Sequence, residues 1–96
     1  MRKITKESIN SFLDRKAFNK QNTKVSILNN KCYLKLHNNI IAILHPDNTL
    51  MITNAGWQSN TTKERLNALP NVNIVQKNFV WYLNGKEWDG NLIDIN

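Results

Sequence analysis

Hydrophobic and polar residues alternate through most of the middle of the chain, which is the pattern of strands with one buried face. The clearest case is residues 31–37, where every second side chain is a leucine or a cysteine. In this segment Cys32, Leu34 and Leu36 face one way, and Tyr33, Lys35 and His37 face the other. We expect it to be a strand of a sheet that is covered on one side only.

Short polar turns separate this strand from others of the same kind. The predicted strands are residues 24–28, 31–37, 40–44, 49–53, 72–77, 79–83 and 86–88. Residues 92–95 add a short edge strand or a tail. The predicted turns are Asn29-Asn30, Asn38-Asn39, residues 45–48 and Asn84-Gly85, because Asn and Gly accept the positive φ of tight hairpin turns. These runs predict an antiparallel meander in which residues 40–44, apolar on both faces, are the most buried strand.

The N-terminal segment has helical periodicity instead. We predict a helix over residues 4–18, with Thr5 as its N-cap and a hydrophobic staple between Ile4 and Ile9. One face of this helix is apolar and consists of Ile9, Phe12, Leu13 and Ala17. In a chain of this size that face is needed for the core, so we expect it to pack on the sheet and not to bind a partner.

A second, shorter helix is predicted near residues 61–69. Thr61 and Glu64 have the spacing of a capping box, in which each side chain bonds the backbone N–H of the other residue. Leu66 and Leu69 share one face, and Pro70 ends the helix. A helix of about two turns is not stable alone, so packing must hold it in place.

These elements predict one α+β domain that spans residues 1–96. The N-terminal helix packs on a strongly bent antiparallel sheet of about five to six strands, with the short helix inserted near residues 61–69. We assign Phe12, Phe79 and Trp81 to the core of this domain.

Three stretches carry a resemblance to a known family. They are NAGW at residues 54–57, TTKERLNA at residues 61–68 and WYLNGK at residues 81–86. This pattern resembles a family of small domains that bacteriophages encode widely. The resemblance covers roughly residues 17–90 and implies a phage origin. It implies no activity, so no functional residue is carried over from it.

Composition favours a protein in the cytoplasm of an infected bacterial host. The chain has no apolar run of about 18 residues that would span a membrane, and its N-terminus lacks the apolar core of a signal peptide. Cys32 is the single cysteine, and its place in a strand pattern favours a buried thiol. We expect no membrane association.

Enzyme chemistry has little support in the sequence. His37 and His45 are the two histidines, and they lie at opposite ends of a predicted hairpin. With one cysteine and no paired-ligand spacing, a zinc site lacks its ligands. No histidine is adjacent in sequence to Ser59 or Cys32 to activate either as a nucleophile, and no glycine-rich phosphate loop occurs. We therefore predict no catalytic activity, no metal and no cofactor.

The charge of the chain is concentrated at one end. Residues 1–35 have a net charge of +7, whereas residues 36–96 have a net charge of −1. A one-sided basic balance is the footprint expected for a protein that binds a polyanion, although a solubilising surface accounts for it equally well. The predicted phosphate or partner contacts are Lys3, Arg15, Lys16, Lys20, Lys24, Lys35, Lys63 and Arg65.

Four aromatic residues are less committed to the core and are candidates to stack on bases or to anchor a partner: Tyr33, Trp57, Tyr82 and Trp88. The start of the short helix offers backbone N–H groups and hydroxyls to a phosphate, although Ser59 and Thr61 as simple helix caps explain the same residues. Each feature has a purely structural reading beside its functional one.

We expect a non-enzymatic, phage-encoded host-takeover protein that binds a host protein or ribonucleoprotein complex. Its sharpest form is a counter-defence inhibitor of the anti-CRISPR kind, an analogy that rests on origin and size. The alternative is a stand-alone basic protein of phage metabolism that binds DNA or RNA directly.

Overall fold

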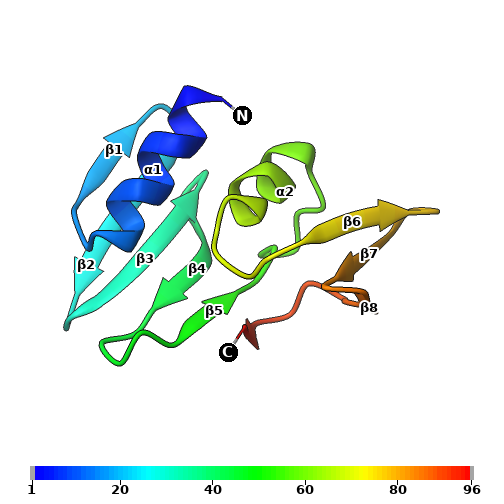
Figure 1. Ribbon diagram of the computed structural model, residues 1–96. Coiled ribbons are helices and arrows are strands. Elements are labelled where there is room, and N and C mark those ends of the chain that lie inside the picture. The colour runs from blue at the N-terminus through cyan, green and yellow to red at the C-terminus, as the bar shows by residue number, and fades with distance from the viewer. Residues whose placement is uncertain (1, 96) are drawn as a thin grey trace.

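A computed structural model describes residues 2–95 and contains a large antiparallel sheet, a small one and two helices (Figure 1). The six-stranded sheet has the order β1-β2-β3-β4-β5-β9, and the three-stranded sheet has the order β6-β7-β8. The helices are α1 (Lys3–Leu13) and α2 (Asn60–Asn67). The strands of the large sheet are β1 (Phe18–Lys20), β2 (Thr23–Leu28), β3 (Lys31–Leu36), β4 (Asn39–Leu44), β5 (Leu50–Ile52) and β9 (Ile93–Asp94). The small sheet contains β6 (Ile74–Lys77), β7 (Val80–Leu83) and β8 (Lys86–Glu87).

The predicted α+β class is confirmed. The sequence pattern predicted a single bent sheet, whereas the structure has two sheets, the second formed by the C-terminal strands β6 to β8. The edge of β5 that faces away from β4 pairs with β9, so β6 does not continue the large sheet there. Residues 92–95 therefore contribute an edge strand, as one of the two expectations had it. Both sheets and both helices contribute side chains to one continuous hydrophobic core.

Helix α1 is shorter than predicted because a left-handed residue ends it. Arg15 has φ 58°, and its N–H donates to the carbonyl of Phe12. The N–H of Lys16 reaches back to the carbonyl of Ser11, which completes a Schellman motif and stops the helix after Leu13. Phe18 then begins β1 instead of extending the helix.

The apolar face of α1 is confirmed at Ile9 and Phe12, which are buried, but not at Leu13 and Ala17, which are exposed. The predicted N-cap is wrong. Thr5 lies inside the helix and is fully buried, and Arg2 occupies the cap position without a side-chain cap.

The hairpin turns follow the predicted asparagines, with one shift. Asn29 and Asn30 both have positive φ, as predicted for the turn between β2 and β3. The next turn uses His37 and Asn38 (φ 50° and 66°), not Asn38-Asn39. Asn39 begins β4 instead, where its amide Nδ2 donates to the carbonyl of His37 at 3.3 Å.

Helix α2 begins at a different cap from the predicted one. The Ser59 hydroxyl accepts the N–H of Thr62 at 3.1 Å, which makes Ser59 the N-cap in place of Thr61. Glu64 consequently makes no capping box and turns towards α1. Leu66 and Leu69 are buried, as predicted.

One predicted core residue lies outside the core. Phe79 is 89% exposed, because it occupies the turn between β6 and β7 with φ 68°. Phe12 and Trp81 are fully buried, as predicted. No helix among residues 2–95 is both long and apolar enough to cross a membrane.

Candidate nucleic-acid interface

The face of the large sheet that α1 leaves uncovered carries most of its charge as lysine. Helix α1 packs on β1, β2 and β3, and the buried side chains of these strands point towards it. Because side chains alternate along a strand, the intervening positions point to the opposite face. We call Lys24, Lys31, Tyr33 and Lys35 on that face the lysine face.

The register between β2 and β3 brings these side chains together. Lys24 lies directly opposite Lys35, and Ser26 lies directly opposite Tyr33. On β3 itself, Tyr33 lies between Lys31 and Lys35 at every second position. Within residues 2–95 none of the three lysines forms an ion pair. Like charges directly opposite each other destabilise a sheet, so this arrangement favours an anionic partner that neutralises them.

Arg65 corrects the predicted set of phosphate contacts, because it lies in the interior. Its side chain is 1% exposed, and its Nε donates to Thr23 Oγ1 at 3.3 Å. Its Nη1 donates to Thr5 Oγ1 and, at 2.8 Å, to Glu64 Oε1. Burial lowers the pKa of Arg65, and the carboxylate of Glu64 opposes that shift. The guanidinium therefore joins both helices to β2 and does not reach a partner.

Three other predicted contacts form hydrogen bonds or ion pairs with other residues of the protein. Arg15 Nη2 donates to the carbonyl of His45 at 2.7 Å, which ties the end of α1 to the turn after β4. Lys20 forms an ion pair with Glu7 at 3.2 Å, and Lys63 reaches Gln76 at 3.5 Å.

Lys3 and Lys16 remain exposed, but they belong to the α1 layer and not to the lysine face. Of the eight predicted cations, the structure therefore places only Lys24 and Lys35 together there. Lys31, a further basic residue of the N-terminal third, joins them.

The predicted aromatic contacts divide in the same way. Trp88 is 6% exposed and packs against Trp81 with ring centroids 6.2 Å apart, so it is not a stacking platform. Its indole N–H donates to the carbonyl of Asn91 at 3.0 Å, which satisfies it internally. Tyr82 is half-buried in the small sheet, and Tyr33 is half-buried on the lysine face. Trp57 is 63% exposed.

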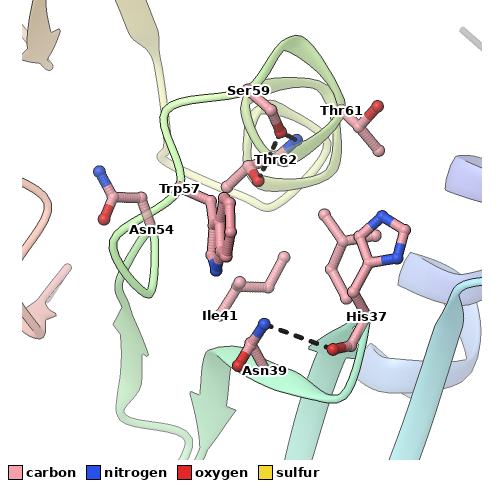
Figure 2. A pocket seen from close by; sticks show the side chains of 9 residues that line it. His37, Asn39, Ile41, Asn54, Trp57, Ser59, Thr61 and Thr62 are labelled. Carbon is pink, nitrogen blue, oxygen red and sulfur yellow. Dashed lines mark hydrogen bonds between the residues drawn. The ribbon is translucent and has the colours of Figure 1, made fainter.

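Trp57 forms one wall of a pocket of about 440 Å³ (Figure 2). The pocket lies between the turn that joins β3 to β4 and the first turn of α2. In Figure 2 the indole stands on one side of the space and His37 on the other, with Ile41 and Asn39 below them. The hydroxyl groups of Ser59, the N-cap of α2, and of Thr62 in its first turn close the upper side. We call this space the Trp57 pocket.

The loop that carries Trp57 is held by Asn54. The side-chain oxygen of Asn54 accepts the N–H of Gly56 at 2.8 Å, and its carbonyl accepts the N–H of Trp57 at 2.9 Å. Gly90 packs against Asn54 so closely that a Cβ atom there would lie 2.1 Å from Asn54 Nδ2. The turn that carries the Trp57 indole is therefore fixed by hydrogen bonds and by close packing at Asn54.

A second hollow of about 340 Å³ lies beside the Trp57 pocket and shares His37 with it. Lys24 lines this second hollow. The Trp57 pocket lies on the α1 side of the sheet, and the Lys24 end of the lysine face adjoins it through His37 at the end of β3. The sequence pattern placed His37 at a strand end, and no signal there indicated this junction.

The structure offers no metal site among residues 2–95, where no three His, Cys, Asp or Glu side chains are grouped to hold an ion. His37 and His45 line different hollows. The hydrogen bonds that Thr49 donates to Asp47, a near neighbour of His45, lower the pKa of this exposed carboxyl.

Comparison with known proteins places the chain in a viral family. A family model described as Kyanoviridae Gp96 protein matches residues 1–94. This match agrees with the phage origin that the sequence pattern implied. Neither the curated proteins nor the solved structures yielded a match.

Proposed function

We propose that this chain, which belongs to the Kyanoviridae Gp96 family of bacteriophage proteins, is a non-catalytic host-takeover protein that binds single-stranded nucleic acid in a host complex. The observation that carries this proposal is the lysine face. Lys24, Lys31 and Lys35 surround Tyr33 and have no carboxylate partner within residues 2–95.

Lysine ammonium groups bind phosphates as point charges without reading sequence. Three such contacts on a single strand predict a slope of about −2 for log affinity against log salt. Affinity should then fall about 20-fold between 50 and 200 mM salt. Tyr33 adds a ring in the middle of this charge, and a ring favours unpaired bases over a duplex because only unpaired bases expose their faces.

A separate observation favours a protein partner as well. Phe79 is 89% exposed at the tip of the hairpin between β6 and β7, and this hairpin extends away from the large sheet (Figure 1). Exposed aromatic side chains are typical anchors of protein interfaces. A protein contact at Phe79 and a nucleic-acid contact at the lysine face together suit a ribonucleoprotein target, and a counter-defence inhibitor of the anti-CRISPR kind is one form of such a protein.

The first test measures binding of a fluorescent ten-nucleotide single strand across a salt series. The triple variant Lys24→Gln, Lys31→Gln, Lys35→Gln should lose at least tenfold in affinity at 50 mM salt and most of the salt slope. The matched control Lys3→Gln, Lys16→Gln, Lys86→Gln removes the same charge elsewhere and should keep both. No binding by the natural protein at low salt, or equal losses in the two variants, would falsify the proposal.

The second test separates the host-complex form from a stand-alone nucleic-acid binder. The tagged protein is recovered from a lysate of infected host cells with and without nuclease treatment. If the protein binds a host complex, a defined complex should survive nuclease treatment and should not be recovered with Phe79→Asn. If it is a stand-alone nucleic-acid binder, no partner should survive nuclease treatment, and Phe79→Asn should behave like the natural protein.

A further inference from the structure

We propose that the Trp57 pocket receives one unpaired nucleobase, stacked on the Trp57 indole and facing His37. This inference rests on the proposed function, because the base belongs to the strand whose phosphates lie on the lysine face. It adds a defined binding site for one base to a surface whose lysines contact the phosphates of the bound strand.

The walls of the pocket suit a flat apolar ring. Trp57 is 63% exposed and forms no ring contact with another aromatic side chain in residues 2–95, so one face of its indole is free to stack. Ile41 supplies apolar surface between Trp57 and His37 (Figure 2), and Leu36 adds a second apolar side chain to the lining. Stacking on an aromatic side chain is the common way in which proteins hold unpaired bases.

The rim of the pocket suits the polar edge of a base. Asn39 donates through Nδ2 to the carbonyl of His37, and its Oδ1 has no hydrogen-bond partner among the described residues. The hydroxyls of Ser59 and Thr62, which are hydrogen-bonded to each other at 2.9 Å, lie at the opposite edge and leave one hydroxyl hydrogen for a ligand. Amide and hydroxyl side chains are among those that hydrogen-bond base edges.

A phosphate suits the pocket less well. The N-terminal N–H groups of α2 are the natural phosphate donors at this position, and the hydroxyl of Ser59 already accepts one of them, the N–H of Thr62, at 3.1 Å. Among the described residues no lysine or arginine lines the pocket to neutralise a phosphate. This lining favours an uncharged ring over a phosphate.

Size and position point to the same ligand. Small-ligand pockets have volumes of roughly 300–1,000 Å³, and the Trp57 pocket, at about 440 Å³, lies near the lower limit. Lys24 lines the hollow that adjoins the pocket at His37. Leu36 points to the α1 side of the sheet, opposite to Lys35, so a strand bound at Lys24 reaches the pocket by passing His37 at the end of β3.

The test compares two ligands that carry identical phosphates. One is a ten-nucleotide oligothymidine, and the other is the same backbone with every base replaced by an abasic tetrahydrofuran. The natural protein should bind the base-containing strand about 5- to 100-fold more tightly. Trp57→Ala should remove that preference and keep the affinity for the abasic strand, whereas the conservative control Trp57→Phe should retain most of the preference.

Fluorescence gives an independent readout. Trp81 and Trp88 are buried, so the exposed Trp57 dominates quenching by a stacked base. Quenching by oligothymidine, but not by the abasic strand, is the expected result, and it should disappear in Trp57→Phe. Equal and salt-dependent binding of both strands, without quenching, overturns the base pocket and leaves the lysine face intact. Absence of binding to either strand overturns the proposed function and the pocket together.

Discussion

Glu64 on α2 accepts a hydrogen bond from the hydroxyl of Thr5 on α1 at 2.6 Å. The same carboxylate oxygen also accepts from Arg65 Nη1 at 2.8 Å and from Arg2 Nε at 2.8 Å. Thr5 in turn accepts from Arg65, whose Nε reaches Thr23 on β2. This network links both helices to the sheet.

The network predicts that acid destabilises the fold through Glu64. The Thr5 hydroxyl, followed by Arg2, lowers the pKa of Glu64 below its ordinary value of 4.5. A lowered pKa in the folded state contributes stability that is fully present above 4.5 and is lost as the pH falls through the folded value. Urea unfolding at pH 7, 4.5 and 3 should show this loss. Glu64→Gln should be less stable at pH 7 and less sensitive to pH, and an equally steep acid loss in this variant contradicts the prediction.

Arg65 should not be replaceable by lysine. A lysine ammonium cannot reproduce the planar fork that contacts Thr5, Thr23 and Glu64 together. We expect Arg65→Lys to cost about 2 kcal/mol in the free energy of unfolding. Nucleic-acid affinity of the folded variant should stay unchanged, since the guanidinium is buried. A stable variant that binds poorly would place Arg65 back in the interface.

Lys35→Glu should change stability and binding in opposite directions. The variant replaces a like-charge pair with Lys24 by an opposite-charge pair across β2 and β3. Cross-strand pairs of this kind contribute roughly 0.2–1 kcal/mol, so thermal stability should rise. Affinity for a single strand should fall, because one phosphate contact is lost and a repulsion is added. Lys16→Glu makes the same charge change outside the lysine face and should leave affinity nearly unchanged.

Phe79→Gly should raise the stability of the free protein. A bulky residue at φ 68° is strained by roughly 1–2 kcal/mol, and glycine adopts this conformation freely. After the greater chain entropy of glycine in the unfolded state is subtracted, a gain of about 0.5–1 kcal/mol remains. Calorimetry should therefore record an increase of a few degrees in Tm. A lower Tm would mean that the exposed ring stabilises the hairpin.

Gly90→Ala should destabilise the protein more than Gly56→Ala. Both glycines have positive φ, so both substitutions introduce backbone strain. At Gly56 a Cβ atom meets nothing within 4 Å, whereas at Gly90 it would lie 2.1 Å from Asn54 Nδ2. We expect a cost of about 1 kcal/mol for Gly56→Ala and at least twice that for Gly90→Ala, measured by urea unfolding. Equal costs would show that Asn54 moves aside without loss.

Local patterns in the sequence were sufficient for most of the secondary structure. Alternation identified β3, because only one face of this strand is buried and its apolar residues Cys32, Leu34 and Leu36 therefore occupy every second position. Asn29-Asn30 and Asn84-Gly85 identified their turns, because asparagine and glycine tolerate a positive φ better than other residues. The positive net charge of the N-terminal third also follows directly from the sequence.

Tertiary structure decided which of these residues face a partner. Arg65 and Lys63 are two residues apart on α2, yet only the packing of α1 and β2 against that helix determined that Arg65 is buried. Lys24 and Lys35 are eleven positions apart in the chain and meet only through the strand register. The Trp57 pocket also joins a turn, a loop and a helix end that are distant in sequence. Local sequence therefore determined the conformation of each segment, and long-range packing determined which side chains remain available for binding.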